Sequence, residues 1–190
     1  MTRLRALCLL IAVALTLALA GCSRNEDLPT GTDDAGRPVD PALLAFLSRA
    51  RSAHHIADGA EEKDDLGRAV EVLRGLVAGP LPSGNPPEVR EVLSDTRARL
   101  ADLESRRGNF DKAARDVDDG LELATETTYF RGHLFEVRGL VEERRAKALE
   151  KEEKTSEAQA AKKRALDAFE ESMKIQAEVI KKAVPTEAGP

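Results

Sequence analysis

Residues 94–123 read SDTRARLADLESRRGNFDKAARDVDDGLEL, and this stretch decides how the chain folds. Apolar and small side chains recur at helical spacing on both sides of Gly108, which predicts two helices joined by a tight turn. We expect Gly108 to end the first helix in a conformation that a Cβ would resist. Ala101, Ala113 and Gly120 are small, and we expect them where helix backbones approach each other closely.

This predicted hairpin resembles one tetratricopeptide repeat. The matching residues are Leu100-Ala101 in the first helix, Gly108-Asn109-Phe110-Asp111 at the turn, and Ala113 with Gly120-Leu121-x-Leu123 in the second helix. The chain departs from the family at Arg97, where a Trp or another large residue is common, and no Pro follows Leu123. The resemblance implies stacked hairpins with a concave face that binds a peptide or a partner helix.

Two further stretches, LGRAVEVLRGLVA at 66–78 and RALDAFEESMKI at 164–175, resemble the second helix of the same repeat. A helical pattern precedes each of them, so the sequence predicts three hairpins, the third lengthened by a charge-rich insertion. The predicted fold class is all-α, with antiparallel helical hairpins stacked as a short tetratricopeptide-like solenoid over residues 41–184. A generic helical bundle with one chance match is the alternative.

Turn signals give the expected ends of the helices. Asp40 is placed to cap the first helix, with Pro41 in its first turn, and Asp58-Gly59 is expected to close it. The Gly- and Pro-rich segment 79–87 predicts a clear break. The helices around that break are expected over about 63–78, 88–107 and 110–124, and another is expected to start near 126–128.

Between Gly139 and Pro185 the chain contains no Gly or Pro, so one long helix and a hairpin both fit. Ser156 and Gln159 have the spacing of a capping box, which favours the hairpin. The last helix is then expected to present one stripe, formed by Ala158, Ala161, Ala165, Phe169, Met173, Gln176 and Ile180.

The N-terminus has the pattern of an export signal. Arg3 and Arg5 precede a run from Ala6 to Ala20 in which Thr16 is the one polar residue. A basic start followed by a short apolar run is typical of a secretory signal peptide, whereas a membrane span needs about 20 apolar residues. An uncleaved apolar anchor is the alternative.

The next residues, Leu19-Ala20-Gly21-Cys22, resemble the lipobox of bacterial lipoproteins. This resemblance implies that residues 1–21 are a cleaved signal and that Cys22 becomes the acylated first residue of the mature protein. Ser23, in place of Asp, favours the outer membrane by the enterobacterial sorting pattern. Residues 22–40 are then a lipidated cysteine and flexible tether, because polar and turn residues dominate them, and 185–190 are expected to be a disordered tail.

Composition and spacing argue against several classes of function. The 34 acidic and 29 basic residues argue against a nucleic-acid-binding protein. Cys8 and Cys22 both precede the predicted domain, and the adjacent His54-His55 and the isolated His133 lack metal-ligand spacing. Acidic pairs at 61–62, 64–65 and 142–143 are expected to be solvent-facing charge. We therefore assign no catalytic, cofactor-binding or metal-binding residue and expect no enzyme activity.

The residues expected to face the groove of the middle repeat are Asp95, Ala98, Asp102, Ser105 and Arg106. Their types fit solvated surface better than a contact face. The sequence thus favours an outer-membrane-anchored, periplasm-facing lipoprotein that acts as a non-catalytic protein-binding adaptor or assembly factor. Its expected partners are the membrane, through the lipid on Cys22, and an envelope protein. The alternatives are an envelope hydrolase or ligand-binding lipoprotein with an unrecognised site, and a purely structural spacer.

Overall fold

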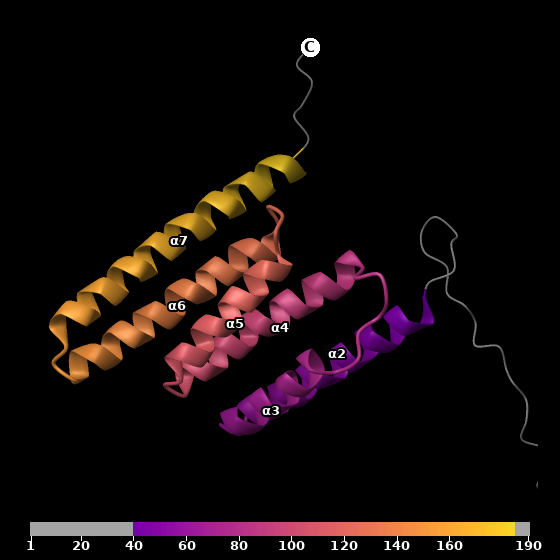
Figure 1. The fold of residues 1–190 in the computed structure, drawn as a ribbon, viewed down its shortest axis with the longest axis horizontal. Helices are drawn as coiled ribbons and strands as arrows, with labels where there is room; N and C mark the ends of the chain where they lie inside the picture. Colours follow the sequence, from indigo (N-terminus) through magenta and orange to yellow (C-terminus); the bar gives the residue numbers. More distant parts are fainter. Residues whose placement is uncertain (1–39, 185–190) are drawn as a thin grey trace, which may run out of the picture. The chain divides into compact units, whose positions relative to one another are not determined.

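The computed structural model describes residues 40–184, in which helices are joined by turns and short loops (Figure 1). The helices are α2 (Pro41–Glu61), α3 (Leu66–Val77), α4 (Pro87–Arg106), α5 (Phe110–Leu123), α6 (Tyr129–Lys151) and α7 (Thr155–Ala183). They pack in pairs as three consecutive hairpins, which confirms the predicted all-α class. The predicted signal peptide, Cys22, the tether up to residue 39 and the tail 185–190 lie outside the described residues.

Local sequence explains where most helices start. The side chain of Asp40 accepts a hydrogen bond from the backbone N–H of Ala42 at 2.9 Å, and Asp65 accepts one from Arg68 at 2.9 Å. These caps satisfy N–H groups that have no partner inside the helix. Gly108 ends α4 with a φ of 79°, as expected for a residue without a Cβ.

The predicted end of the first helix is wrong. The helix α2 continues through Asp58-Gly59 to Glu61, because its buried face continues through Ala57 and Ala60. The turn follows instead, with Asp64 at a φ of 58°.

The charge-rich region from residue 129 onward forms a hairpin rather than one long helix. Its turn lies between Lys151 and Thr155, and Glu153 adopts a φ of 59° there. The predicted capping box at Ser156 is wrong, because α7 starts at Thr155 and its N-terminus has no side-chain hydrogen bond. The hairpin therefore forms without a cap, held by the extensive packing of α6 on α7.

The middle hairpin holds the stack together. Its helix α4 packs against α2 and α3 on one side and against α6 on the other, and α5 also packs on α6. Leu100 and Leu103 are fully buried against the first hairpin, whereas Ala98 and Ala101 are buried toward the third. A Cβ on Gly120 would lie 2.6 Å from Leu134 of α6, so the small residue is required by close approach, as predicted.

The interface between α6 and α7 is built from small residues. Gly132 and Gly139 of α6 face α7, and the Ser172 hydroxyl donates a hydrogen bond to the Gly132 carbonyl at 2.8 Å. The residues of α7 that are buried are Ala158, Ala161, Ala165, Ala168, Ser172 and Ile175.

The predicted stripe on α7 is confirmed at Phe169 and Gln176, which lie against Gly139 and Gly132 of α6, and is wrong at Met173 and Ile180. Met173 and Ile180 are each 63% exposed and point away from the core. Four alanines and Ser172 make up most of the buried face of α7, and the glycines of α6 leave room for its larger side chains, Phe169 at Gly139 and Ile175 at Gly132. Within residues 40–184, none of the helices has the length and hydropathy needed to cross a membrane.

Candidate functional site

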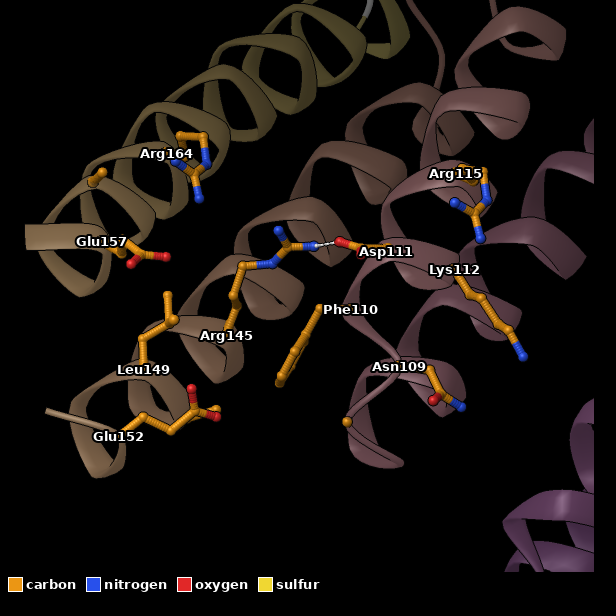
Figure 2. A pocket seen from close by; sticks show the side chains of 13 residues that line it. Asn109, Phe110, Asp111, Lys112, Arg115, Arg145, Leu149, Glu152, Glu157 and Arg164 are labelled. Carbon is orange, nitrogen blue, oxygen red and sulfur yellow. Dashed lines mark hydrogen bonds and ion pairs between the residues drawn. The ribbon is translucent and has the colours of Figure 1, made fainter. Parts of the chain in front are cut away.

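A groove runs between α5 and α7, and α6 forms its floor (Figure 2). It consists of two pockets of about 660 and 390 Å³ that share Arg164 as a lining residue. We call it the α5–α7 groove; its lining includes Phe110, Asp111, Ala114 and Val117 of α5, Phe135, Arg138, Glu142, Arg145 and Leu149 of α6, and Glu157, Ala160, Arg164, Asp167 and Ala168 of α7. No Cα of α5 lies within 8 Å of a Cα of α7, so the two walls do not close over the floor.

The floor of the groove is one face of α6. Its lining residues recur every three or four positions from Phe135 to Leu149, which places them on a single side of the helix. The Arg145 guanidinium lies 5.7 Å from the centre of the Phe110 ring, and the Arg138 guanidinium lies 5.6 Å from that of Phe135. The floor thus combines aromatic surface with cationic groups that stack on it.

Ion pairs tie each wall of the groove to the floor. On the α5 side, Arg145 donates to Asp111 at 2.9 Å, and Arg138 pairs with Asp118. On the α7 side, Arg164 donates two hydrogen bonds to Glu142, at 2.7 and 2.9 Å.

The ion pair with Arg164 corrects the prediction for Glu142, which was expected to be solvent-facing charge. Glu142 is only 8% exposed, because the α7 helix covers it and supplies the guanidinium that neutralises it. The groove keeps its shape without contact between its walls, since both walls are fixed to α6.

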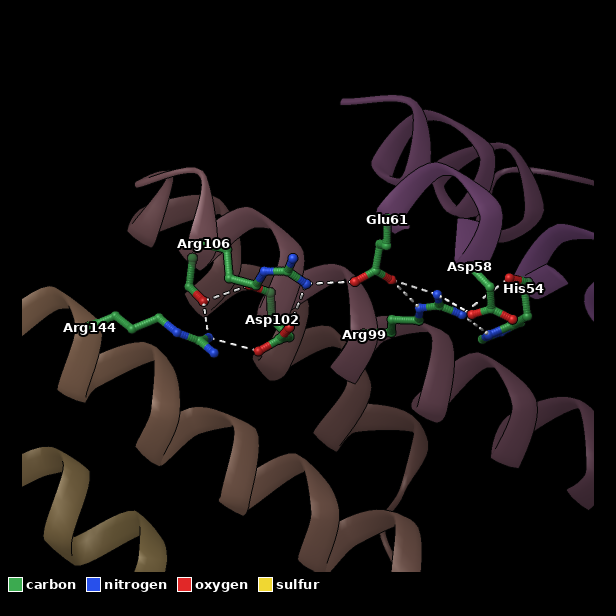
Figure 3. A network of polar contacts seen from close by, with 8 residues as sticks. His54, Asp58, Glu61, Arg99, Asp102, Arg106 and Arg144 are labelled. Carbon is green, nitrogen blue, oxygen red and sulfur yellow. Dashed lines mark hydrogen bonds and ion pairs between the residues drawn. The ribbon is translucent and has the colours of Figure 1, made fainter. Parts of the chain in front are cut away.

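A second polar cluster joins the first helices of the three hairpins (Figure 3). Arg99 of α4 donates to Glu61 and to Asp58 of α2, each at 2.6 Å, and Arg106 donates to the other oxygen of Glu61 at 2.6 Å. On the other side of α4, Asp102 accepts from Arg144 of α6 at 2.8 Å. The cluster therefore bridges α2 to α4 and α4 to α6.

This bridging overturns part of the prediction for the middle repeat. Ala98 and Ser105 were expected at a solvated surface, but they are 0% and 3% exposed because α6 packs over this part of α4. Asp102 and Arg106 are engaged in ion pairs with neighbouring helices. Asp95 is partly exposed. The face that the repeat pattern suggested for binding is thus largely occupied by contacts within the chain.

His54 lies within this cluster in one defined tautomer. The Thr96 hydroxyl donates to the carbonyl of Val92 at 2.7 Å, so it accepts from His54 Nε2, 3.0 Å away. Nδ1 of His54 is left to accept from Arg99, at 3.2 Å. Burial lowers the pKa of His54 below its ordinary value of 6.5, and the Arg99 guanidinium lowers it further, against the opposing effect of Asp95 and Asp58.

Glu61 was also expected to be solvent-facing, and its side chain is instead 23% exposed between two guanidinium groups. Burial acts to raise the pKa of Glu61, but the hydrogen bonds from Arg99 and Arg106 outweigh burial and lower it. Glu61 thus carries its charge as a structural bridge.

Asp116, to which the sequence pattern gave no role, has a side chain that is 2% exposed. It accepts hydrogen bonds from Arg74 of α3 at 2.6 Å and from Arg97 of α4 at 2.7 Å. Arg97 is the residue that departs from the repeat pattern, and the carboxylate of Asp116 explains what this arginine does. The sequence did contain a signal for this buried ion pair: Asp116 lies between Ala113 and Gly120, on the side of the helix that was predicted to be buried.

The histidines show no arrangement typical of a metal site. His133 stacks on the Tyr129 ring and lies 3.4 Å from Glu136, and His55 is exposed. Among residues 40–184, no three or more His, Cys, Asp or Glu side chains are grouped so that they could hold a metal ion.

Comparisons with family models, with curated proteins and with solved structures find no match to this chain.

Proposed function

We propose that this protein is an outer-membrane lipoprotein, acylated on Cys22, that acts as a non-catalytic protein-binding adaptor or assembly factor in the periplasm. The lipobox-like sequence Leu19-Ala20-Gly21-Cys22 supports the anchor, and Ser23 supports the choice of membrane. Residues 94–123, with the order of the three hairpins, support a tetratricopeptide-like solenoid as the folded part.

The α5–α7 groove is the observation that carries the adaptor role. A partner helix lying along α6 from Phe135 to Leu149 would run between the two walls, which is the helix-in-groove mode of recognition. Lys112, Arg115 and Glu157 line the groove and make no ion pair with any other described residue. Charged groups at the rim of a groove set the orientation of a bound segment more than its affinity.

The anchor is tested by mass spectrometry of the protein purified from bacterial membranes. The proposal expects a mature N-terminus at residue 22 carrying acyl chains, and a Cys22→Ser chain that keeps residues 1–21 and carries no lipid. An unmodified Cys22 in the membrane fraction contradicts the anchor, whatever the protein binds.

The adaptor role is tested by crosslinking and affinity capture of the lipidated protein from its own membranes. Ala160→Arg projects a long cation into the groove from an exposed position of α7, so it is expected to abolish recovery of the partner. Ala45→Arg makes the same change at an exposed position of α2, outside the groove, and serves as the matched control. Capture of lipid without any reproducible protein contradicts the adaptor role, and equal capture by both variants removes the groove from it.

A further inference from the structure

A second cleft, of about 320 Å³, lies between α3 and α5. Both helices pack on α4, and no Cα of α3 lies within 8 Å of a Cα of α5. We call it the α3–α5 cleft; its lining residues are Arg74, Glu104, Lys112, Arg115, Asp116 and Asp119. All six are charged, whereas the α5–α7 groove also has aromatic and aliphatic side chains in its lining.

Every carboxylate of the α3–α5 cleft already has a partner within the protein. The partners are Arg74 and Arg97 for Asp116, Asn109 and Arg107 for Glu104, and Arg97 for Asp119. Lys112 and Arg115, in contrast, are exposed and make no ion pair with any other described residue. The charge that this cleft leaves uncompensated is therefore positive.

The two cations occupy positions that α5 itself disfavours. Lys112 is the third residue of the helix, where the N-terminal end of the helix dipole repels a cation, and Arg115 is a like charge three positions further on. Figure 2 shows both side chains extending away from Arg145, on the other side of α5.

The acidic residues one turn away from these two cations do not relieve the repulsion. Asp111 pairs with Arg145 of α6, and Asp116 and Asp119 both pair with Arg97 of α4. All three carboxylates are thus directed to arginines of other helices. A local rule broken without compensation within the fold is typical of a site that meets a ligand.

We propose that the α3–α5 cleft binds an acidic segment of a protein partner, whose carboxylates pair with Lys112 and Arg115. The inference rests on the proposed adaptor role, because it takes the ligand to be a protein. The two cations are about 4.5 Å apart along the helix axis, so neighbouring acidic side chains of one segment can reach both. The whole chain has a net charge of −5, so an acidic segment is attracted only where positive charge is locally in excess.

The lining favours carboxylates over phosphate as the bound group. None of the six lining residues has a hydroxyl or amide side chain that could donate to phosphate oxygens. Asp116 and Glu104, at the bottom of the cleft, repel a doubly charged phosphate more strongly than a singly charged carboxylate.

The site is tested by fluorescence anisotropy of a labelled octaglutamate peptide with the full chain in detergent at low ionic strength. Lys112→Gln combined with Arg115→Gln is expected to weaken binding at least tenfold. Lys181→Gln combined with Lys182→Gln removes the same charge from exposed positions in the last turn of α7 and is expected to leave binding unchanged. A parent chain that does not bind the peptide, or an equal loss in the two double variants, overturns the inference.

Inorganic phosphate distinguishes the acidic segment from a free anion as the ligand. Phosphate and chloride at the same ionic strength are expected to displace the peptide to the same extent, because both act only by screening. Stronger displacement by phosphate would make the cleft a phosphate site and overturn the acidic segment as its ligand.

Urea unfolding separates a binding role of the two cations from a structural one. The double variant at Lys112 and Arg115 is expected to unfold at the same or a higher urea concentration than the parent chain, because glutamine keeps the helix propensity and removes the repulsion. A lower midpoint would show that the two cations serve the fold, and the inference would fail.

Capture from membranes separates failure of this site from failure of the adaptor role. A partner recovered equally well by the parent chain and by the double variant at Lys112 and Arg115 overturns the site and leaves the adaptor role standing. If the parent chain recovers no protein, the adaptor role fails, whereas binding of the octaglutamate peptide still decides whether the cleft takes acidic side chains.

Discussion

Arg74 of α3 forms a bidentate ion pair with the carboxylate of Asp116 on α5, a residue 42 positions away in the sequence. Nη1 donates to Oδ1 at 2.6 Å and Nη2 pairs with Oδ2, while Arg97 of α4 donates to Oδ1 at 2.7 Å. One nearly buried acidic side chain thereby connects the first hairpin to both helices of the second.

Asp116→Ala is expected to lower the free energy of unfolding by about 2–3 kcal/mol. Removing a buried carboxylate is costly, but Arg74 keeps an ion pair with Glu104 at 3.5 Å and Arg97 keeps one with Asp119 at 3.0 Å, so the expected cost lies just below that of a cation left with no partner. Urea unfolding followed by circular dichroism measures it. Asp118→Ala, which removes the exposed carboxylate paired with Arg138, is the control and is expected to cost less than about 1 kcal/mol. If both variants lose the same free energy of unfolding, the buried ion pairs of Asp116 stabilise the fold no more than the exposed one of Asp118.

Gly139→Ala is expected to destabilise the α6–α7 hairpin, because a Cβ there would lie 2.6 Å from Cδ1 of the Phe169 ring. We expect a loss of about 1–3 kcal/mol from overpacking, measured as a lower midpoint of thermal or urea unfolding. Gly75→Ala provides the comparison, since a Cβ at this helical position meets nothing within 4 Å and is expected to stabilise by about 0.5–1 kcal/mol. Adding Phe169→Leu should recover part of the Gly139→Ala loss; if it does not, the ring is not the cause.

Because of His54, the free energy of unfolding is expected to fall as the pH drops. Because its pKa in the folded protein lies below the ordinary value of 6.5, the unfolded chain binds the proton first. The stabilisation is therefore complete above pH 6.5 and is lost as the pH falls through the pKa of the folded state. Protonation of Nδ1 would also remove the acceptor that Arg99 uses.

His54→Gln is expected to flatten the pH dependence of unfolding between pH 7 and the lower pKa, measured by urea titrations at a series of pH values. His55→Gln changes the neighbouring, exposed histidine and is expected to leave the profile as in the parent chain. A profile that stays unchanged in His54→Gln would contradict the assigned hydrogen bonds of the ring.

Asp65→Ala is expected to cost about 1 kcal/mol, because it removes the side-chain oxygen that caps α3 through the N–H of Arg68. Asp65→Asn keeps a capping oxygen and is expected to retain most of the stability. Glu62→Ala removes an exposed acidic side chain but keeps the backbone N–H through which Glu62 ends α2, so it serves as the control for lost charge. The order of the three variants in chemical unfolding decides whether the cap or the charge matters.

Much of the fold was predictable because its signals are local. Gly108 and the Gly- and Pro-rich segment 79–87 end helices through their own backbone preferences, whatever surrounds them. The small residue at Gly120 indicated a close approach, and the structure places Leu134 against it. The α5–α7 groove could not be predicted, since it depends on how far two helices that never touch diverge over a third.

Sequence by itself determined the all-α class, the three hairpins and most helix starts, because helical periodicity, caps and turn residues act over a few neighbouring positions. The lipobox-like residues around Cys22 rest on the sequence as well and stay a prediction. Only the tertiary structure decided which face of α7 is buried, because neighbouring faces of a helix differ by one residue and the packing on α6 places Ala168 and Ser172 inside and Met173 outside. It also decided which charges are structural: Asp116 and Glu142 are buried because arginines from other helices reach them.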